Sequence, residues 1–260
     1  MNRNKVGTCK CVDYYKDHTD NLFVRQKMVN GTPLEIKCNN KVGNGEHFCE
    51  KHKKCKNFMK KFTSGDEPEY NPNIWSHPYI EGSHNCYAYF LDDIMTSLKK
   101  KCEKICKKDE KENCPTKPRK CRSLIPQPGD YSLFKKYGSL DKKTFKYNCK
   151  EMERKIMSDN PIVKKVQLTE NCGKDMYKGA MVTDPGSTFH FYRQNKDGTW
   201  SHKPGTLPIT REDANGLPIY SPYTANRNYS KPNDSDPINY TDFCGYYCLP
   251  TEKKSKTYAQ

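Results

Sequence analysis

The chain has 260 residues, of which 46 are Lys or Arg and 31 are Asp or Glu, so its formal net charge is +15. Only 33% of the residues are hydrophobic, and no run reaches the roughly 18 to 20 apolar residues that cross a bilayer, which excludes a membrane-spanning helix. The 18 Tyr, 10 Phe and 2 Trp residues supply bulky side chains for a modest core. The polar start lacks the apolar stretch of a signal peptide, so we expect a protein that is made in the cytoplasm and not secreted.

Residues 1–65 are a basic, irregular segment that is rich in cysteine. The stretch from Cys49 to Cys55 has the spacing of metal ligands, and Cys38 or the pair Cys9 and Cys11 can complete a tetrahedral zinc site. A small module with few large apolar residues would gain folding free energy from such a metal. We therefore expect a structural zinc ion that is held by Cys38, Cys49, His52 and Cys55. Disulfides and free thiols are the alternatives.

A linker rich in Gly, Pro and acidic residues, 64–72, separates this segment from a predicted helix. Ser83 and Asn85 are candidate N-caps, and the apolar residues that follow recur at intervals of three and four. These residues are Leu91, Ile94, Met95, Leu98, Cys102 and Ile105. The pattern places Cys86 in the first turn of the helix, where the positive end of the helix dipole favours a thiolate.

Residues 99–122 are a lysine-rich insertion with eleven Lys or Arg residues and four Asp or Glu residues, a local charge of +7. Such a surface attracts polyanions, so nucleic acid is a candidate partner through this insertion. A solvated lysine face that keeps the protein soluble is the alternative. Cys102 and Cys106 share a helical face and precede Cys114 and Cys121, which indicates a disulfide clip or a second metal site across the insertion.

The chain after the insertion changes from helix to strand. We expect a helix over 144–158, strands over 162–168 and 176–182, and a hairpin over 188–202. After Gly205 the composition is rich in Pro, Asn, Asp and Tyr, which predicts an extended segment. Cys244 and Cys248 can tie this segment back to the body of the protein, and two buried small side chains are the alternative.

The loop of the hairpin decides which side chains share a face. If Asn195 closes on Thr199, across a type I turn followed by a left-handed glycine, then Tyr192 faces His202. His190 and His202 then project from the same face and lie diagonally across the two strands. A plain two-residue turn would put the two imidazoles on opposite faces.

These side chains match the requirements of thiol-dependent catalysis. A neighbouring imidazole can activate a thiol, and a third polar group must orient that imidazole. Cys86 is then the nucleophile, His190 the base and His202 the orienting group. The alternatives are a packed, bridged or metal-bound Cys86 and a His190 that only makes hydrogen bonds within the sheet. His84 is a rival base or metal ligand.

A cysteine at a helix start, a histidine on a strand and a polar residue on the next strand resemble the papain-like fold of cell-wall amidases and related cysteine peptidases. The resemblance covers residues 83–205, although the Asp-Cys-Ser-Gly of that family is absent around Cys86. It implies an α+β fold in which the Cys86 helix packs on a small antiparallel sheet, and it implies the same roles for Cys86, His190 and His202. We therefore expect three parts, namely a Cys-rich module over 1–65, a papain-like domain over 66–205 and an extended segment over 206–260.

Longer strings resemble uncharacterised proteins of giant DNA viruses of protists, and they lie at 48–55, 83–89, 126–129, 190–194, 200–205 and 243–248. This resemblance implies a protein of the virus particle, with other virion or capsid proteins as partners. A virus that carries its own thiol oxidase can form disulfides in the cytoplasm, which would reconcile 14 cysteines with a protein that is not secreted. We expect a virion-associated thiol hydrolase. A non-catalytic minor capsid protein and a nucleic-acid packaging factor are the alternatives.

Overall fold

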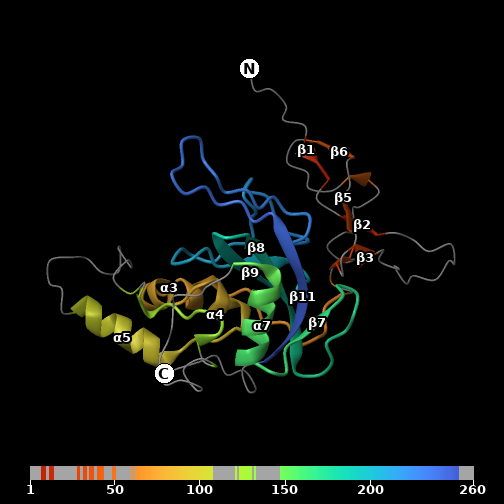
Figure 1. The fold of residues 1–260 in the computed structure, drawn as a ribbon. Helices are drawn as coiled ribbons and strands as arrows, with labels where there is room; N and C mark the ends of the chain where they lie inside the picture. Colours follow the sequence, from red (N-terminus) through yellow and green to blue (C-terminus); the bar gives the residue numbers. More distant parts are fainter. Residues whose placement is uncertain are drawn as a thin grey trace.

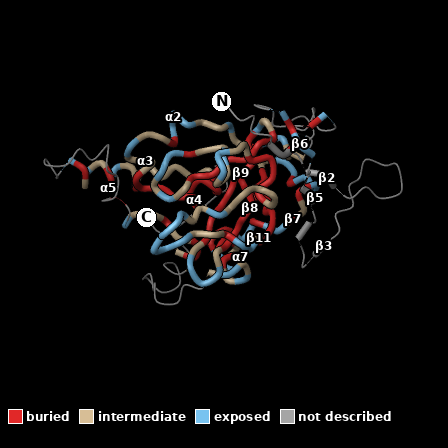
Figure 2. The backbone as a smooth tube through the Cα atoms, turned by 90° about the horizontal axis from the view of Figure 1, so that it is seen from above, coloured by how far each residue is buried: buried red, intermediate tan, exposed pale blue. Residues whose placement is uncertain are grey.

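The computed structural model describes residues 7–9, 12–14, 28–29, 32–33, 35–37, 40–43, 49–50, 60, 62–107, 121, 123–130, 132 and 147–251. A few helices lie beside one large antiparallel sheet (Figure 1), which confirms the predicted α+β class. The buried residues gather in the centre of the molecule (Figure 2), and many of them are aromatic.

The central sheet has five strands, in the order β10, β9, β8, β11, β7, and all neighbours are antiparallel. The strands are β7 (Lys164–Val166), β8 (Met176–Asp184), β9 (Thr188–Gln194), β10 (Trp200–His202) and β11 (Asp242–Pro250). The sequence patterns predicted the first four of these. Strand β11 was not expected, and it lies inside the sheet between β7 and β8. Its last seven residues are buried, because an inner strand has neighbours on both edges and both faces.

Three short two-stranded sheets form the described part of the N-terminal region. They pair β1 (Gly7–Thr8) with β6 (Lys41–Val42), β2 (Val12–Tyr14) with β5 (Glu35–Lys37), and β3 (Met28–Val29) with β4 (Thr32–Pro33). Cys9, Val42 and Cys49 join the same buried cluster as Val166 and Tyr246 of the central sheet. This part of the N-terminal region therefore packs on the sheet.

The β9–β10 hairpin has the predicted register. The backbone N–H of Asn195 donates to the carbonyl of Thr199 at 2.8 Å, and His202 lies opposite Tyr192. Gly198 has a φ of 84°, the left-handed conformation that the turn needs. His190 and His202 therefore project from the same face of the sheet.

The predicted helix over 83–105 is wrong in one respect, because two helices form instead of one. Helix α4 (Cys86–Phe90) ends after five residues, and α5 (Thr96–Lys107) begins after a break in which Asp92 has a φ of 48°. The carboxylate of Asp92 pairs with the buried guanidinium of Arg193 on β9. This long-range ion pair holds a left-handed residue in place, and a left-handed residue cannot continue a helix.

Helix α4 packs very closely on the sheet. The ring of Phe90 lies 4.5 Å from the ring of Phe191, measured between centroids. A Cβ atom added to Gly179 on β8 would lie only 2.3 Å from the Phe90 ring. Gly179 is therefore required by close approach, since any side chain there would push α4 away.

The remaining helices complete the layer on this face. They are α2 (Pro72–Trp75), α3 (Pro78–Ser83) and α7 (Cys149–Asp159). The side chain of Asn148 caps α7 by accepting the N–H of Glu151 at 2.9 Å, and Met152 and Ile156 share one buried cluster with Cys86. Helices α4 and α7 thus cover one face of the sheet, whereas the other face is covered by the chain between 209 and 241.

Disulfides join distant parts of the described chain. Cys149 of α7 is bonded to Cys244 of β11, Cys172 is bonded to Cys248, and Cys102 is bonded to Cys121. The prediction that Cys244 and Cys248 tie the C-terminal segment to the body is confirmed. Disulfides form and persist in oxidising surroundings. No helix in the described ranges is both long and apolar enough to span a membrane.

Candidate active site

Cys86 is the first residue of α4, as expected. The side chain of Asn85 caps the helix by accepting the backbone N–H groups of Tyr87 and Ala88, each at 3.2 Å. The amide of Asn85 also donates to the carbonyl of Pro126 at 2.8 Å, which fixes the cap in the core. A helix of five residues has a small dipole, so it supports a thiolate less than the predicted long helix would.

His190 and His202 form a directly bonded pair. The Nε2 of His190 lies 2.7 Å from the Nδ1 of His202, and the Nε2 of His202 lies 2.9 Å from the backbone oxygen of Glu212. Burial lowers the pKa of His202 to about 4 and lowers that of His190 well below its usual range, with the charge of His202 as the second cause for His190. Both rings are therefore neutral near pH 7.

The hydrogen bonds fix the tautomer of each neutral ring. A carbonyl oxygen only accepts, so the Nε2 of His202 must carry the proton that is donated to Glu212. The Nδ1 of His202 is then an acceptor, and the Nε2 of His190 donates to it. This assignment makes Nδ1 of His190 the unprotonated, basic nitrogen, which is the atom that can take a proton from a thiol.

The thiol of Cys86 lies near the backbone of strand β9. Strand β10 pairs with β9 only from Tyr192 to Gln194, so the backbone of Phe191 lies beyond the end of β10. The backbone of Phe191 lies near enough to the sulfur of Cys86 to lower its pKa, against the larger effect of burial. The thiol thus lies at the strand edge, one residue along the backbone from His190.

The two imidazoles and the thiol have different side-chain neighbours. Cys86 belongs to the cluster of Phe191 and α7, whereas the ring of His190 stacks on Tyr240 at 5.3 Å and meets Tyr192 at 5.2 Å. Among the described residues, the hydrogen bond of His190 goes to His202 and not to the sulfur. The structure therefore brings the two histidines together on the face of Tyr192 and Tyr240, whereas it places Cys86 among the side chains of the opposite face.

The site is closed to solvent. Cys86 is 5% exposed, His190 is 3% exposed and His202 is 1% exposed. Burial raises the pKa of Cys86 to about 12, although the N–H of Phe191 and the ammonium of Lys203 act in the opposite direction. In this closed form Cys86 is a neutral thiol.

The cover of the site is the chain between 222 and 240. Arg227 holds it, since its guanidinium donates to the carbonyls of Tyr240 at 3.0 Å and Pro222 at 2.8 Å. The N–H of Asn239 donates to the Asp184 carboxylate at 3.0 Å and anchors the cover to the end of β8. Tyr240, placed between these anchors, lies directly over the imidazole of His190.

His84, the predicted rival base, has a structural role. Its Nδ1 lies 2.9 Å from the hydroxyl of Ser83 and 3.1 Å from the carbonyl of Ile80, and its Nε2 accepts the N–H of Met95 at 2.9 Å. Both ring nitrogens are therefore used to join α3 to the chain before α5.

The predicted zinc ligands lie mostly outside the described residues, which include Cys49 but not Cys38, His52 or Cys55. Cys49 is buried, and its N–H donates to the sulfur of Cys9 at 3.2 Å. The side-chain amide of Asn40 donates to the sulfur of Cys49 at 3.4 Å. Cys9 and Cys49 are thus neighbours, and Cys11, the other member of the predicted pair, lies outside the described residues.

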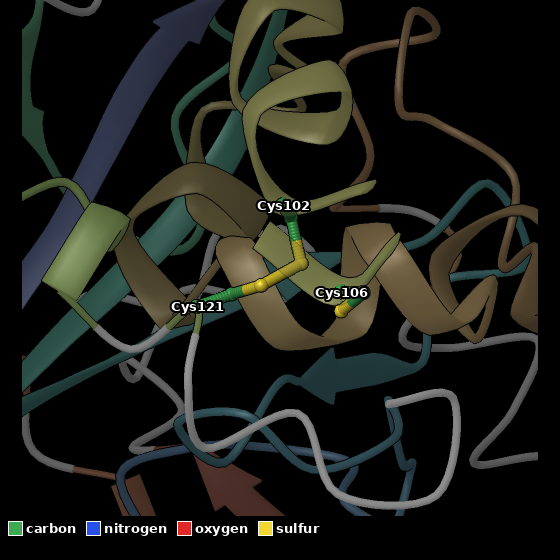
Figure 3. A group of neighbouring side chains, drawn as sticks. All are labelled: Cys102, Cys106 and Cys121. Carbon is green, nitrogen blue, oxygen red and sulfur yellow. A yellow bond between two sulfur atoms is a disulfide. The ribbon is translucent and has the colours of Figure 1, made fainter. Parts of the chain in front are cut away.

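A second cysteine group lies at the lysine-rich insertion (Figure 3). The sulfurs of Cys102, Cys106 and Cys121 lie within 4.8 Å of one another and could hold a metal ion if they were reduced. Cys102 and Cys121 are bonded to each other, however, and Cys106 is also part of a disulfide. The disulfide clip that we expected across the insertion is the form found here.

Comparisons with known proteins place few constraints on the chain. No family model and no solved structure matches it. A segment of 67 residues is 39% identical to "Insoluble matrix shell protein 1" of the clam Ruditapes philippinarum. The match covers 26% of this chain and 38% of the clam protein, so it spans well under half of either chain.

Proposed function

We propose that this protein is a thiol-dependent hydrolase of amide bonds, with Cys86 as nucleophile, His190 as base and His202 as orienting group. The observation that carries the proposal is a chain of two hydrogen bonds, in which His190 donates to His202 and His202 donates to the carbonyl of Glu212. It leaves a basic nitrogen on His190 for a thiol proton. The order of the elements, with Cys86 on a helix and the two histidines on successive strands, supports a papain-like site.

The proposed reaction needs an open form in which the cover has moved and the sulfur of Cys86 reaches Nδ1 of His190. In that form the thiol proton passes to this nitrogen. The sulfur attacks the amide carbonyl carbon, the C–N bond breaks and His190 returns the proton to the leaving amine. A thioester then remains on Cys86. Water, activated by His190, attacks the thioester and releases a carboxylic acid and the thiol. General acid–base catalysis of this kind contributes roughly 100- to 10,000-fold.

A peptidyl acyloxymethyl ketone, which alkylates activated thiols, tests the proposal on the full chain. We expect mass spectrometry to find the label on Cys86, and we expect His190→Ala to reduce the labelling rate by about 100-fold or more. His202→Asn should keep most of the rate, because an amide oxygen can also accept from His190, whereas His202→Ala should not. The proposal fails if folded His190→Ala labels Cys86 as fast as the wild-type protein.

We also propose that the protein is carried in the particle of a large DNA virus, beside other virion or capsid proteins. The basic, cysteine-rich composition and the disulfides support this setting, since such a virus can oxidise thiols in the cytoplasm. Mass spectrometry of purified particles after nuclease and protease treatment tests it. Loss of the protein from protease-treated intact particles would argue against it.

A non-catalytic structural protein is the second candidate. The disulfides, the buried thiol of Cys86 and the similarity to a protein named as an insoluble shell matrix component favour it. Such a protein would be built into an extracellular or particle assembly. A Cys86→Ser variant that assembles normally, combined with no labelling of wild-type Cys86, would favour this candidate over the hydrolase.

Two finer proposals concern ligands. Helix α5 exposes Lys100, Lys101, Lys104 and Lys107, which supports nucleic-acid binding through residues 99–122. Binding to a DNA duplex that collapses with a few-fold rise in salt would support this proposal. Zinc held by Cys49 with Cys38, His52 and Cys55 is the other, and elemental analysis of the purified chain tests it. Zinc that is lost in Cys49→Ser but kept in Cys86→Ser is the expected result.

A further inference from the structure

Two lysines of the central sheet are completely buried. Lys178 on β8 and Lys203, which follows β10, both have a relative exposure of 0%. A buried ammonium loses its hydration, so it must find acceptors inside the protein. Nothing in the sequence pattern separates these two lysines from the many exposed ones, and their surroundings show what each does.

Lys203 is held by a complete set of acceptors. Its ammonium donates to the carbonyl of Glu81 at 2.9 Å, to that of Gly205 at 2.8 Å and to that of Leu207 at 3.0 Å. An ammonium has three N–H bonds, and all three are used. Burial lowers the pKa of Lys203 to about 7, so the positive charge is present below about pH 7. The carbonyls fix the position of this charge, but as neutral groups they do not cancel it.

This fixed charge lies on the Cys86 side of the sheet. Side chains alternate along a strand, so Ser201 and Lys203 project opposite to His202. The hydroxyl of Ser201 lies 2.6 Å from that of Tyr89, which shows that this is the face covered by α4. The carbonyl of Glu81 ties Lys203 to α3, the helix that leads into Cys86.

Three titratable groups face the ammonium of Lys203. Glu81 is at the surface of α3, His84 has both ring nitrogens bonded, and Cys86 is the buried thiol. The charge of Lys203 favours the thiolate of Cys86, and after burial and the N–H of Phe191 it is the next largest influence on that thiol. Cys86 is the group among these three that is buried and can become an anion.

We infer that Lys203 is a positioning residue that stabilises the thiolate of Cys86, through an ammonium that three backbone carbonyls fix on the same face of the sheet as the thiol. The inference rests on the proposed function in so far as the thiolate is the reacting form. It adds a second positive charge to the site, because His190 becomes an imidazolium when it takes the thiol proton and burial disfavours that charged ring. Lys203 supplies this positive charge from the face of β10 that is opposite to His202.

The chain offers a matched control in Lys178. It is equally buried on the same sheet, and its ammonium also bonds a backbone carbonyl, that of Phe62, but the carboxylates of Glu67 and Glu170 are its charged neighbours. Lys178→Met therefore removes a buried ammonium without removing charge from Cys86. Any loss that comes only from a damaged sheet should appear in both lysine variants.

The experiment measures the rate at which iodoacetamide alkylates Cys86 in the full chain as a function of pH, with the modified peptide quantified by mass spectrometry. Below the pKa of a thiol this rate is proportional to its thiolate fraction. We expect Lys203→Met to lower the rate by tenfold or more, and Lys203→Arg and Lys178→Met to stay within about threefold of the wild-type protein. Thermal melting identifies variants that have lost the fold.

The inference is overturned if folded Lys203→Met reacts like the wild-type protein, or if Lys178→Met loses as much. If Lys203→Met does not fold, Lys203→Arg decides, because a tenfold loss in a variant that keeps both the charge and the melting temperature contradicts an electrostatic role. The readout is independent of hydrolysis. A rate that depends on Lys203 but not on His190 would reject the proposed hydrolase and keep the role of Lys203, and the reverse result would do the opposite.

Discussion

The Nε2 of His190 lies 2.7 Å from the Nδ1 of His202, and this bond joins two strands of the same hairpin. It is possible because a loop with one left-handed glycine sets a register in which both rings share a face. The bond has a cost, since both imidazoles are buried and must remain neutral. We therefore expect acid to destabilise the folded protein through protonation of this pair.

We expect the free energy of unfolding to fall as the pH falls from about 6.5 towards 4. Burial lowers the pKa of His202 and of His84 to about 4 and lowers that of His190 well below its usual range, whereas an unfolded histidine has a pKa of about 6.5. Between these values the unfolded chain binds protons that the folded chain does not, so acid favours unfolding. Each histidine contributes about 1.4 kcal/mol per pH unit.

Urea unfolding of the wild-type protein and His202→Asn at several pH values checks this dependence. The variant should lose about 1.4 kcal/mol per pH unit of the slope, because it has one titrating ring fewer. An unchanged slope in His202→Asn would show that His202 is already protonated or exposed in the folded protein.

Tyr240→Ala should open the candidate site. Its ring stacks on His190, and its removal takes away the side chain that covers the imidazole. We expect alkylation of Cys86 by iodoacetamide to become at least several-fold faster, and we expect the melting temperature to fall because a buried ring is lost. Tyr220→Ala removes another buried tyrosine from the same face and should leave the rate unchanged. Equal rates in the wild-type protein and Tyr240→Ala would mean that Tyr240 does not limit access.

Gly179→Ala should destabilise the protein by about 1–3 kcal/mol, because its Cβ would lie 2.3 Å from the ring of Phe90. The clash would push α4 and hence Cys86 away from the sheet. In a double-mutant cycle measured by urea unfolding, Phe90→Leu should recover part of the loss. Additive effects of the two substitutions would show that Phe90 is not the group that excludes a side chain at position 179.

The disulfides should differ in their contribution to stability. Cys149 and Cys244 are 95 residues apart in sequence, whereas Cys102 and Cys121 are 19 apart. In the chain-entropy account, a fivefold longer loop makes the first bond stabilise the fold by about 1.4 kcal/mol more. Urea unfolding of the two double Cys→Ala variants measures this difference. Equal losses would indicate that strain or residual structure outweighs loop entropy.

Parts of the candidate site that depend on local chemistry could be predicted from the sequence. The turn after Gln194 and the two-residue period of the strands were enough to place His190 and His202 on one face. Asn85 was a candidate cap because Asn accepts backbone N–H bonds, and it does begin the helix of Cys86. These features involve residues that are close in sequence.

Other parts of the site could not be predicted in this way. Lys203 resembles any other lysine in the sequence, and only the tertiary structure shows that it is buried and held by three carbonyls, one of them in the helix that leads into Cys86. The cover formed by Tyr240 comes from a segment that composition alone described as extended. No local signal reports either contact, because each joins residues that are far apart in the chain.

The sequence by itself determined the α+β class, the strands β8 to β10, the register of the hairpin and the face that its two histidines share, since turn chemistry and side-chain period are local properties. Only the tertiary structure decided where α4 ends, because the left-handed Asp92 is held by Arg193 from a distant strand. It also decided the central position of β11, the pairing of Cys149 with Cys244 and the burial of Cys86 in the cluster between α4, α7 and the sheet. These features arise from packing between remote segments, and that packing selects among arrangements which the local sequence leaves equally open.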